Sequence, residues 1–391
     1  MTPVNCSRLL EISKFVAPEI IFGLGASAQA GECALRLGAR KVFIVSDKNV
    51  LAAGWVERVL AYIKQVGLEY RIWFNITCNP KDYEIADGVK EYQAAECDAI
   101  IAVGGGSAID AAKAIAVLAS NGDSLKDFEG VNKINRPLPP MVMIPSTGGS
   151  GSEVSQFAII VDSTRKIKMT IVSKSLVPDI AIIDPYLLNT LDAKIAASTG
   201  IDALCHSIES YVSLAATPLT DVHALYAVNL IAHNLRESVA CRSNLDAKHA
   251  MAMASLQAGL AFSNAILGVT HAMTHQVDGF LDRNHGESNA VLMPHVMEYN
   301  LIACATRYAK VAEALGVKVE GMSRWKAAEK SISWVRKLCQ DIDLPRSLSE
   351  IGLEREVIET LAENALNDVC LVTNPRDTAK EDLINLFTRA L

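Results

Sequence analysis

Three of the eight histidines lie within one short segment, residues 268–287, which reads GVTHAMTHQVDGFLDRNHGE. His271 and His275 are four positions apart, so on a helix they share one face. Zinc proteases have the same spacing but place a glutamate directly after the first histidine, and here that residue is Ala272. The segment, which also holds His285, therefore indicates another kind of metal site, a catalytic base or a cluster of core histidines.

A second helical pair lies upstream, in the segment GIDALCHSIESYVS at residues 200–213. Asp202 and His206 are also four positions apart and would share one helix face. One carboxylate and three imidazoles would suit Fe(II), Zn(II) or a similar divalent ion. Two such pairs and a further histidine in an H-G-E turn argue against chance clustering and favour a metal site.

A glycine-rich turn offers a seat for a phosphate group. Residues 101–116, IAVGGGSAIDAAKAIA, read as a strand, a turn of three glycines and a helix. Glycines let the backbone approach a ligand closely, and a helix N-terminus presents free N–H groups and a positive dipole. The G-x-G-x-x-G dinucleotide fingerprint is absent, so this turn by itself is weak evidence for a nucleotide site.

Two neighbouring features strengthen the nucleotide interpretation. A second polar, glycine-rich loop, PSTGGSGSE at residues 145–153, also follows a strand and could hold a phosphate or the nicotinamide ribose. Asp47 ends the apolar run KVFIVSD, where its carboxylate could accept a hydrogen bond from a ribose hydroxyl. The same charge would repel a 2′-phosphate and favours NAD over NADP. Asp47 could equally cap a helix, and the two roles can coexist.

The elements that must position these residues fall into two groups. Buried strands are expected at residues 41–47, 70–77, 98–107, 139–147 and 180–185, because these runs are almost continuously apolar. Helices are expected between them at residues 51–66, 82–95 and 107–119. This alternation predicts a doubly wound α/β domain with a parallel sheet, over residues 1–187.

The rest of the chain reads as helical. Helices are expected at residues 192–213, 218–240, 245–265, 301–315, 325–340, 354–366 and 378–390. We therefore predict an all-helical domain over residues 188–391, joined to the first domain by a short connection. Small-ligand sites favour clefts between such domains.

Composition narrows the class of protein. The 391 residues are 50% apolar and carry a net charge of −7 with no basic tract, which argues against nucleic acid as a partner. Neither a secretory signal nor an apolar run long enough to span a membrane is evident. Nine dispersed cysteines without a C-x-x-C pair indicate reduced thiols in the cytoplasm. The slightly positive mean hydropathy suggests a buried subunit interface, as in a homodimer or higher homo-oligomer.

Taken together, the motifs resemble those of the iron-containing (group III) alcohol dehydrogenases over nearly the whole chain. The resemblance is carried by GGGSAIDAAKAIA, PSTGGSGSEV, LVPDIAIIDP, GIDALCHSIESYVS, GVTHAMTHQVDGF, NHGESNAVLMPHVMEYN and TNPRDTAKEDLINLF. It implies the dehydroquinate synthase-like fold of this family, with an α/β dinucleotide-binding domain and an all-helical metal-binding domain. It also implies hydride transfer between NAD(H) and a small primary alcohol or aldehyde.

The resemblance assigns roles to individual residues. The metal, Fe(II) or alternatively Zn(II) or another divalent ion, would be held by Asp202, His206, His271 and His285. His275 would lie beside the metal without binding it and would move a proton. The cofactor would contact Asp47, Gly104, Gly105, Gly106, Ser107, Ser146, Thr147 and Lys168. Ser146 departs from a common threonine, and the alignment of Lys168, expected to bind ribose, rests on a variable loop.

Other functions stay open at this point. A glycerol-dehydrogenase-like polyol oxidoreductase or a dehydroquinate-synthase-like enzyme would pair a similar nucleotide domain with a metal-bearing helical domain. A non-enzymatic nucleotide or metal sensor is a further alternative. Phe157, Phe262 and Phe280 are candidates for an apolar substrate pocket, whereas Cys205, next to His206, is expected to be packing.

Overall fold

Short runs rich in valine and isoleucine form a six-stranded parallel sheet in the first half of the chain. In the computed structural model, which describes residues 14–122 and 124–391, the strand order is β1-β9-β6-β4-β2-β3. The strands are β1 (Glu19–Phe22), β2 (Lys41–Val45), β3 (Glu69–Trp73), β4 (Ala99–Gly104), β6 (Met141–Pro145) and β9 (Ile180–Ile183). All residues of β4, β6 and β9 are buried, as expected for strands covered on both faces.

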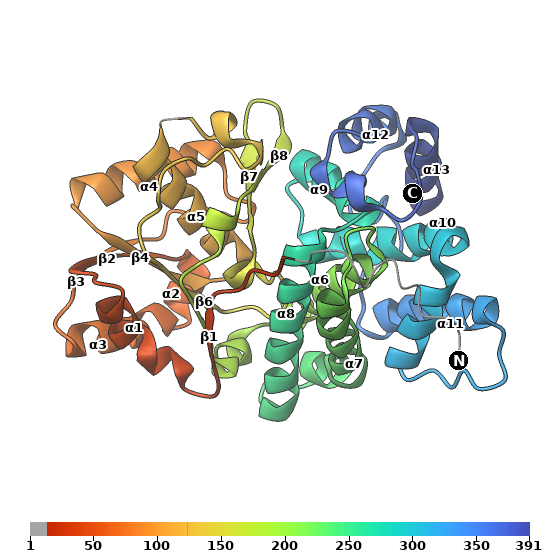
Figure 1. Cartoon of the computed structure of the whole chain (residues 1–391), viewed down its shortest axis with the longest axis horizontal. Helices are drawn as coiled ribbons and strands as arrows, with labels where there is room; N and C mark the ends of the chain where they lie inside the picture. The colour runs from red at the N-terminus through yellow and green to blue at the C-terminus, as the bar shows by residue number, and fades with distance from the viewer. Residues whose placement is uncertain (1–13, 123) are drawn as a thin grey trace.

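Helices cover both faces of this sheet, on the left of Figure 1. They are α1 (Ala30–Arg36), α2 (Lys48–Ala52), α3 (Trp55–Gln65), α4 (Asp82–Ala94) and α5 (Gly106–Asn121). A small second sheet, in the order β5-β8-β7, lies beside them, with β5 (Gly130–Val131), β7 (Phe157–Asp162) and β8 (Ile167–Val172). The hairpin of β7 and β8 lies at the border with the second half of the molecule (Figure 1).

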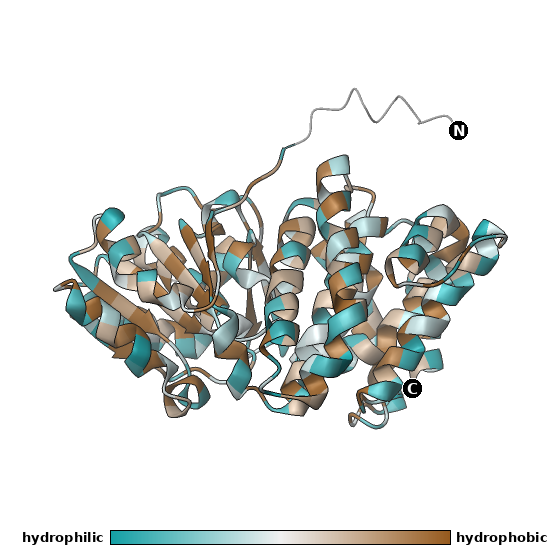
Figure 2. Ribbon diagram, turned by 90° about the horizontal axis from the view of Figure 1, so that it is seen from below, coloured by the Kyte–Doolittle hydropathy of each residue, from teal (hydrophilic) through white to brown (hydrophobic). Residues whose placement is uncertain are grey.

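The second half consists of helices. They are α6 (Ala193–Val212), α7 (Pro218–Ala240), α8 (Leu245–Ala265), α9 (Val269–Leu281), α10 (His285–Ala314), α11 (Arg324–Asp341), α12 (Ile358–Ala365) and α13 (Lys380–Ala390). Figure 2 shows apolar strands enclosed on one side and helices with mixed apolar and polar faces on the other. In α6, every residue from Gly200 to Val212 is buried, so this helix forms the centre of the helical half.

The predicted fold class is confirmed: a parallel α/β half precedes a helical half. All five expected strands are present, although the one expected at 70–77 already ends at Trp73. Strand β1 and the hairpin of β7 and β8 were missed, as was the first half of α10. Strand β1 is a four-residue edge strand with no buried residue, so it lacks the continuous buried apolar run that identified the others.

The predicted domain division at 187/188 falls within a 3-10 turn at Pro185–Thr190, between β9 and α6. Glycines of residues 148–151 press against the helical half: a Cβ on Gly149 would lie 2.2 Å from the Thr199 carbonyl oxygen. One on Gly151 would lie 2.6 Å from the Cα of Gly259. The halves are therefore in tight contact, and the division into domains of residues 1–187 and 188–391 remains a proposal.

The structure also bears on the thiols and on membrane spans. All eight cysteines of the described residues are free. In the same part of the chain, no single helix is long and apolar enough to cross a membrane; α8 and α9 pass that test only as a pair bent by 104°. The expectation of no secretory signal rests partly on residues 1–13, which lie outside the described residues.

Candidate metal centre and cofactor loops

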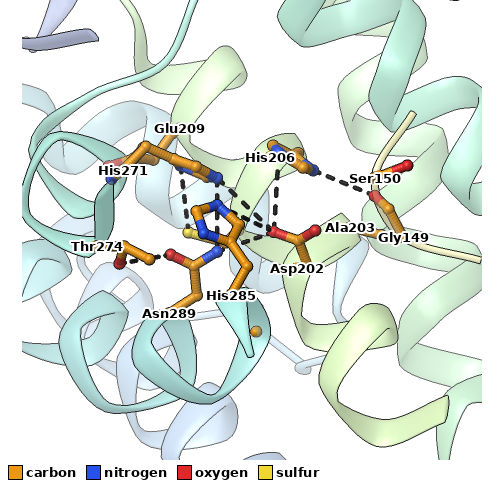
Figure 3. Close-up of polar contacts among 12 residues, drawn as sticks. Gly149, Ser150, Asp202, Ala203, His206, Glu209, His271, Thr274, His285 and Asn289 are labelled. Atoms are coloured by element: carbon orange, nitrogen blue, oxygen red, sulfur yellow. Dashed lines mark hydrogen bonds and ion pairs between the residues drawn. The ribbon is translucent and has the colours of Figure 1, made fainter. Parts of the chain in front are cut away.

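Three helices bring the predicted ligands together. Asp202 and His206 lie on adjacent turns of α6, His271 lies on α9, and His285 is the first residue of α10. Asp202, His206 and His271 are almost completely buried, while the side chain of His285 is 22% exposed. Figure 3 shows these four side chains pointing toward one another.

The four side chains are grouped around the carboxylate of Asp202. The Nε2 atoms of His206, His271 and His285 each lie 3.8 Å from the Oδ1 atom of Asp202. Bonds of 2.0–2.2 Å in a tetrahedral site would place neighbouring donor atoms roughly 3.4 Å apart. The donor atoms of Asp202, His271 and His285 also lie within 4.8 Å of one another, a group that does not include His206. A small contraction would bring Asp202, His271 and His285 to one divalent ion, whereas Nε2 of His206 is close to Asp202 but not to every other donor.

The outward ring nitrogens are held by separate partners. Nδ1 of His271 donates to Oε2 of Glu209 at 2.7 Å, and Nδ1 of His285 donates to Oδ2 of Asp278 at 2.6 Å. Nδ1 of His206 donates to the carbonyl oxygen of Gly149 at 3.2 Å. Because these partners accept hydrogen bonds, the neutral form of each ring carries its proton on Nδ1 and directs the lone pair of Nε2 inward. Such outer contacts orient metal-bound histidines and raise their basicity.

Burial sets the charge of these groups. Burial lowers the pKa of His206 to about 3, so its imidazole is neutral near pH 7. Burial and the ammonium group of Lys168 also lower the pKa of His285. Burial raises the pKa of Asp202, but the neighbouring His206 and His285 outweigh it and leave that pKa below its usual range. Burial lowers the pKa of His271 as well, but Cys205, Asp202 and Glu209 outweigh it and hold that pKa well above its ordinary value. The centre thus offers one carboxylate and two neutral imidazoles, and a metal ion would displace a proton from His271.

Cys205 lies next to the cluster without joining the donors. Its Sγ atom is 3.8 Å from Nδ1 of His271, the outward nitrogen of that ring. Burial raises the pKa of its thiol to about 12, so it remains protonated near neutral pH. Metals bind the thiolate, so the expectation that Cys205 is packing agrees with its surroundings.

Asn289 on α10 was not anticipated from the sequence. Its Nδ2 atom donates to Oδ1 of Asp202 at 2.9 Å, and its Oδ1 atom accepts from the hydroxyl of Thr274 at 2.8 Å. Figure 3 shows its amide beside the ligand cluster. Asn289 therefore fixes the orientation of the one carboxylate in the cluster.

His275 lies beside the cluster on the next turn of α9. Its ring centroid is 6.1 Å from that of His271 and 5.5 Å from that of His285. Its Nδ1 atom donates to Oδ2 of Asp368 at 2.8 Å, and its buried Nε2 atom has no hydrogen-bond partner. His275 is therefore adjacent to the predicted ligands but held by a partner of its own.

Lys168 is located differently from the expected ribose contact. It lies on β8, and its Nζ atom donates to Oδ2 of Asp278 at 3.1 Å. The same carboxylate oxygen accepts from His285, so Lys168 is linked to the metal cluster through Asp278. Its side chain is only 6% exposed. Its predicted contact with ribose is neither shown nor contradicted by this arrangement.

The predicted cofactor residues meet at one edge of the sheet. Strands β2, β4 and β6 are adjacent and parallel, so their carboxyl ends lie side by side at one edge of the sheet. Asp47 follows β2, the three glycines follow β4, and Ser146 and Thr147 follow β6. In open α/β sheets, ligands bind at this edge, where the strand order changes direction.

The two glycine-rich loops touch. The backbone N–H of Ser146 donates to the carbonyl oxygen of Gly104 at 2.9 Å. A Cβ on Gly105 would lie 3.1 Å from the side chain of Thr147, and one on Gly106 would lie 2.9 Å from that of Ser150. Helix α5 begins at Gly106, so this turn opens a helix, as predicted. Side chains at these glycines would close the space between the loops.

Asp47 caps α2 and also faces the glycine turn. Its Oδ1 atom accepts from the backbone N–H groups of Asn49 and Val50, at 2.8 and 3.1 Å. Its Oδ2 atom would lie 3.6 Å from a Cβ on Gly104. One carboxylate oxygen therefore serves the helix, and the other lies beside the predicted phosphate seat.

Two of the three phenylalanines proposed for a substrate pocket lie near the ligands. Phe262 stacks on His206 with ring centroids 4.3 Å apart, and Phe157 packs on Phe262 at 5.8 Å. Phe280 is 44% exposed and lies outside this cluster, so its assignment to the pocket was wrong. Positions 271 and 280 are nine residues apart on α9, which places them on opposite faces of the helix.

Several partners of the predicted residues were missed. Glu209 and Asp278 could have been predicted from the sequence, because each continues a helix face that was already identified. Asp202, His206 and Glu209 are spaced by four and three residues. Asp278 follows His275 by three residues. Asp368 could not have been predicted in this way, since it lies 93 positions from His275 in sequence.

Comparison with known proteins agrees with this geometry. The sequence profile described as "Iron-containing alcohol dehydrogenase" matches residues 17–185, and that described as "Fe-containing alcohol dehydrogenase family, C-terminal" matches residues 196–391. The NAD-dependent methanol dehydrogenase of Bacillus methanolicus is 40% identical over 377 residues, which cover 96% of this chain and 99% of that protein. The 1,3-propanediol dehydrogenase of Klebsiella pneumoniae is 40% identical over 379 residues, covering 96% and 98%. The structure of an alcohol dehydrogenase from Oenococcus oeni superposes with a TM-score of 0.94 at 38% identity, covering 97% of this chain and 100% of that one.

Proposed function

The chain belongs to the iron-containing alcohol dehydrogenase family, and from that premise we propose that it interconverts small primary alcohols and their aldehydes. It is an oxidoreductase that uses NAD(H) and a divalent metal, as the names of its relatives and of its family indicate. The names methanol dehydrogenase and 1,3-propanediol dehydrogenase favour a short substrate with a primary hydroxyl. The overall reaction converts alcohol and NAD⁺ into aldehyde, NADH and a proton.

One observation carries the assignment of the metal residues: three Nε2 atoms surround the Asp202 carboxylate at equal distances. We propose that Asp202, His206, His271 and His285 hold the ion. When bound, the ion supplies Lewis acidity that polarises the substrate oxygen. Glu209 and Asp278 keep the Nδ1 atoms of His271 and His285 protonated, so their Nε2 atoms stay directed inward.

We assign the transfer of the substrate's hydroxyl proton to His275. Its Nε2 atom is buried, has no partner and lies beside the ligand cluster. We propose that this atom accepts the proton of the substrate hydroxyl during oxidation and returns it during reduction. Phe262, which stacks on His206, and Phe157, which packs on Phe262, shield that side of the cluster from water.

We propose that the cofactor lies across the carboxyl ends of β2, β4 and β6. The turn Gly104–Gly105–Gly106, with Ser107, would bind the pyrophosphate at the start of α5. Ser146 and Thr147 would contact the nicotinamide half, Lys168 the nearby ribose, and Asp47 the adenine ribose. Asp47→Gly should remove most of the preference for NADH over NADPH, because a 2′-phosphate would no longer meet a carboxylate. Equal use of both cofactors by the wild type would contradict this role; kcat/KM for each cofactor decides it.

The function is tested with one substrate panel. Protein loaded with Fe(II), with Zn(II) or stripped by a chelator is mixed with NADH and aldehydes of increasing chain length, and NADH absorbance is followed. We expect turnover of short aldehydes that depends on the metal, with the reverse reaction on the matching alcohols. A marked preference for glycerol and other vicinal polyols would instead support the glycerol-dehydrogenase-like alternative. Family membership leaves no support for a non-enzymatic sensor.

The cell compartment and assembly are part of the proposal. The free cysteines support a reducing compartment, and we propose the cytoplasm. Leu219, Val222 and Tyr226 lie three or four positions apart on α7, and each is about half exposed or more, which supports a homodimer or higher homo-oligomer. We propose no nucleic-acid partner, because the chain has a net charge of −7 and contains no basic tract. Light scattering of the purified protein tests the assembly, and a monomer at micromolar concentration would contradict it.

A further inference from the structure

The ring of His275 has an unpaired Nε2 atom on one side and is held by Asp368 on the other. Asp368 lies at the start of a 3-10 turn, Val369–Thr373, that leads away from α12. It approaches α9 from the C-terminal part of the chain, and its side chain is only 3% exposed. Nothing in the sequence pattern connects it to the histidines.

Asp368 uses both carboxylate oxygens. Its Oδ1 atom accepts from the backbone N–H of Cys370 at 2.9 Å, and its Oδ2 atom accepts from Nδ1 of His275 at 2.8 Å. Burial raises the pKa of this carboxyl, but the adjacent His275 outweighs that effect and the pKa lies below its ordinary value. Asp368 is therefore ionised near neutral pH and can only accept hydrogen bonds.

A carboxylate at Nδ1 decides the tautomer of a neutral imidazole. Because Asp368 only accepts, the proton of His275 resides on Nδ1 and the lone pair resides on Nε2. That Nε2 atom is the buried one without a partner. In the opposite tautomer, Nε2 would carry a hydrogen and could not accept one from a hydroxyl. The orientation of the ring is fixed by the same hydrogen bond.

We propose that Asp368 is a positioning residue for the reaction, which holds His275 in the tautomer whose Nε2 atom accepts the substrate proton. This inference rests on the proton-transfer role of His275 in the proposed function. Asp368 touches neither the four metal residues nor the reacting atoms; it acts only through His275. The remaining alternative is that Asp368 merely caps the 3-10 turn through the N–H of Cys370.

Two substitutions separate these roles. Asp368→Asn is nearly isosteric but has only one acceptor oxygen. If that oxygen accepts from the N–H of Cys370, the NH₂ group of the asparagine faces Nδ1 of His275. An NH₂ donor there favours the tautomer with the proton on Nε2. Asp368→Ser keeps a good capping residue but its shorter side chain cannot reach His275. We expect both variants to lower kcat by about 10²-fold, the low end for general acid–base catalysis, with KM for NADH and metal content unchanged. A capping role alone predicts nearly full activity for both variants.

A double-mutant cycle shows whether Asp368 acts through His275. His275→Ala should itself lower kcat by about 10²-fold. Adding Asp368→Ala to that variant should change kcat by less than about twofold, because residues that act as one unit are strongly non-additive. An equal loss from Asp368→Ala in both backgrounds would overturn the proposal, as would loss of metal in Asp368→Asn. Normal activity of His275→Ala would instead remove the proton-transfer role on which the proposal rests, leaving the metal assignment intact.

A spectroscopic measurement gives a readout independent of turnover. Protein labelled with ¹⁵N-histidine and loaded with diamagnetic Zn(II) reports the tautomer of each ring, with His275→Ala used to assign its signals. We expect Nδ1 to carry the proton of His275 in the wild type and Nε2 to carry it in Asp368→Asn. A protonated Nε2 in the wild type would refute the proposal.

Discussion

Two groups of buried ionisable side chains meet the loop at residues 145–153, and they use their polar atoms differently. One is the metal cluster of Asp202, His206, His271 and His285. The other, called here the buried trio, consists of Asp110 and Lys113 on α5 and Glu153 in the loop. Both groups are almost inaccessible to solvent, apart from part of His285. Burial alone therefore does not tell a ligand site from a structural cluster.

The ammonium group of the buried trio is held by contacts within the fold. Nζ of Lys113 donates to the carbonyl oxygens of Ser155 and Phe157, at 2.7 and 2.9 Å, and to the hydroxyl of Ser155 at 3.2 Å. Oδ2 of Asp110 accepts from the backbone N–H of Ile159 at 3.2 Å. All three ammonium hydrogens thus have partners inside the fold, and Lys113 fastens α5 to the start of β7.

The metal cluster has the opposite arrangement. Its partners, Glu209, Asp278 and the Gly149 carbonyl, all bind the outward Nδ1 atoms, while the Nε2 atoms face a common point. A buried lone pair without a partner is costly unless a ligand fills it. The trio also has two buried atoms without a partner, Oδ1 of Asp110 and Oε2 of Glu153, and burial raises the pKa of both carboxyl groups. The comparison indicates that the convergence of such atoms on one point, and not their number or the number of buried charges, marks a ligand site.

Removal of a ligand should have the largest effect. His271→Ala or His285→Ala should lose the ion and lower turnover roughly 10³-fold or more, because a metal supplies several kcal/mol of transition-state stabilisation. In His271→Ala, Glu209 keeps its backbone donors at Gly268 and Thr270, so we expect the fold to survive. Metal analysis beside steady-state kinetics checks this. Stoichiometric iron or zinc with full activity in either variant would show that the cluster is not the metal site.

Loss of the amine of the buried trio should act on the fold and not on the metal. Lys113→Met leaves two carbonyl oxygens without donors and two buried carboxyl groups without a cation. We expect the free energy of unfolding to fall by about 3 kcal/mol, because buried acceptors lose a charged donor, at a cost of roughly 1–3 kcal/mol each. Urea unfolding measures the loss, and metal content of the folded variant serves as the control. If Lys113→Met kept its stability but lost the metal, the structural role assigned to the buried trio would be wrong.

An outer partner of the metal cluster should have an intermediate effect. Asp278→Asn weakens the hold on Nδ1 of His285, which donates to it at 2.6 Å. We expect the affinity for the ion to fall about 10- to 100-fold, as is typical when such partners are replaced. Competition with a fluorescent chelator gives the dissociation constant. An unchanged constant would mean that Asp278 serves Lys168 and Ser288, its other side-chain partners, and not the metal.

The pH dependence of the buried trio should give the smallest effect. Burial is the main cause that raises the pKa of Glu153, from 4.5 to about 7. A raised folded-state pKa means that the folded chain binds more protons, so this contribution is complete below pH 4.5 and is lost as pH rises through about 7. Between pH 5 and 8 the wild type should lose about 2 kcal/mol relative to Glu153→Gln. Unfolding of both proteins at the two pH values tests the sign; an equal change in both would contradict it.

The sequence predicted the elements whose signal is local. Asp202 and His206, like His271 and His275, were recognisable because a helical repeat places residues four apart on one face. The buried parallel strands were recognisable because both of their faces are apolar. The hairpin of β7 and β8 was missed although its residues are mostly buried, because it lies beside the main sheet and does not follow the strand–helix alternation.

The amino-acid sequence by itself thus determined the fold class and the residue types of a divalent-metal site with a nearby nucleotide seat. Only the tertiary structure decided which ring nitrogen faces inward. That choice depends on Glu209, Asp278, the Gly149 carbonyl and, for His275, on Asp368. It also decided that Lys168 contacts Asp278 across the interface between β8 and α9. The physical reason is that periodicity records which face of an element is buried, whereas a hydrogen bond between distant elements depends on how those elements dock.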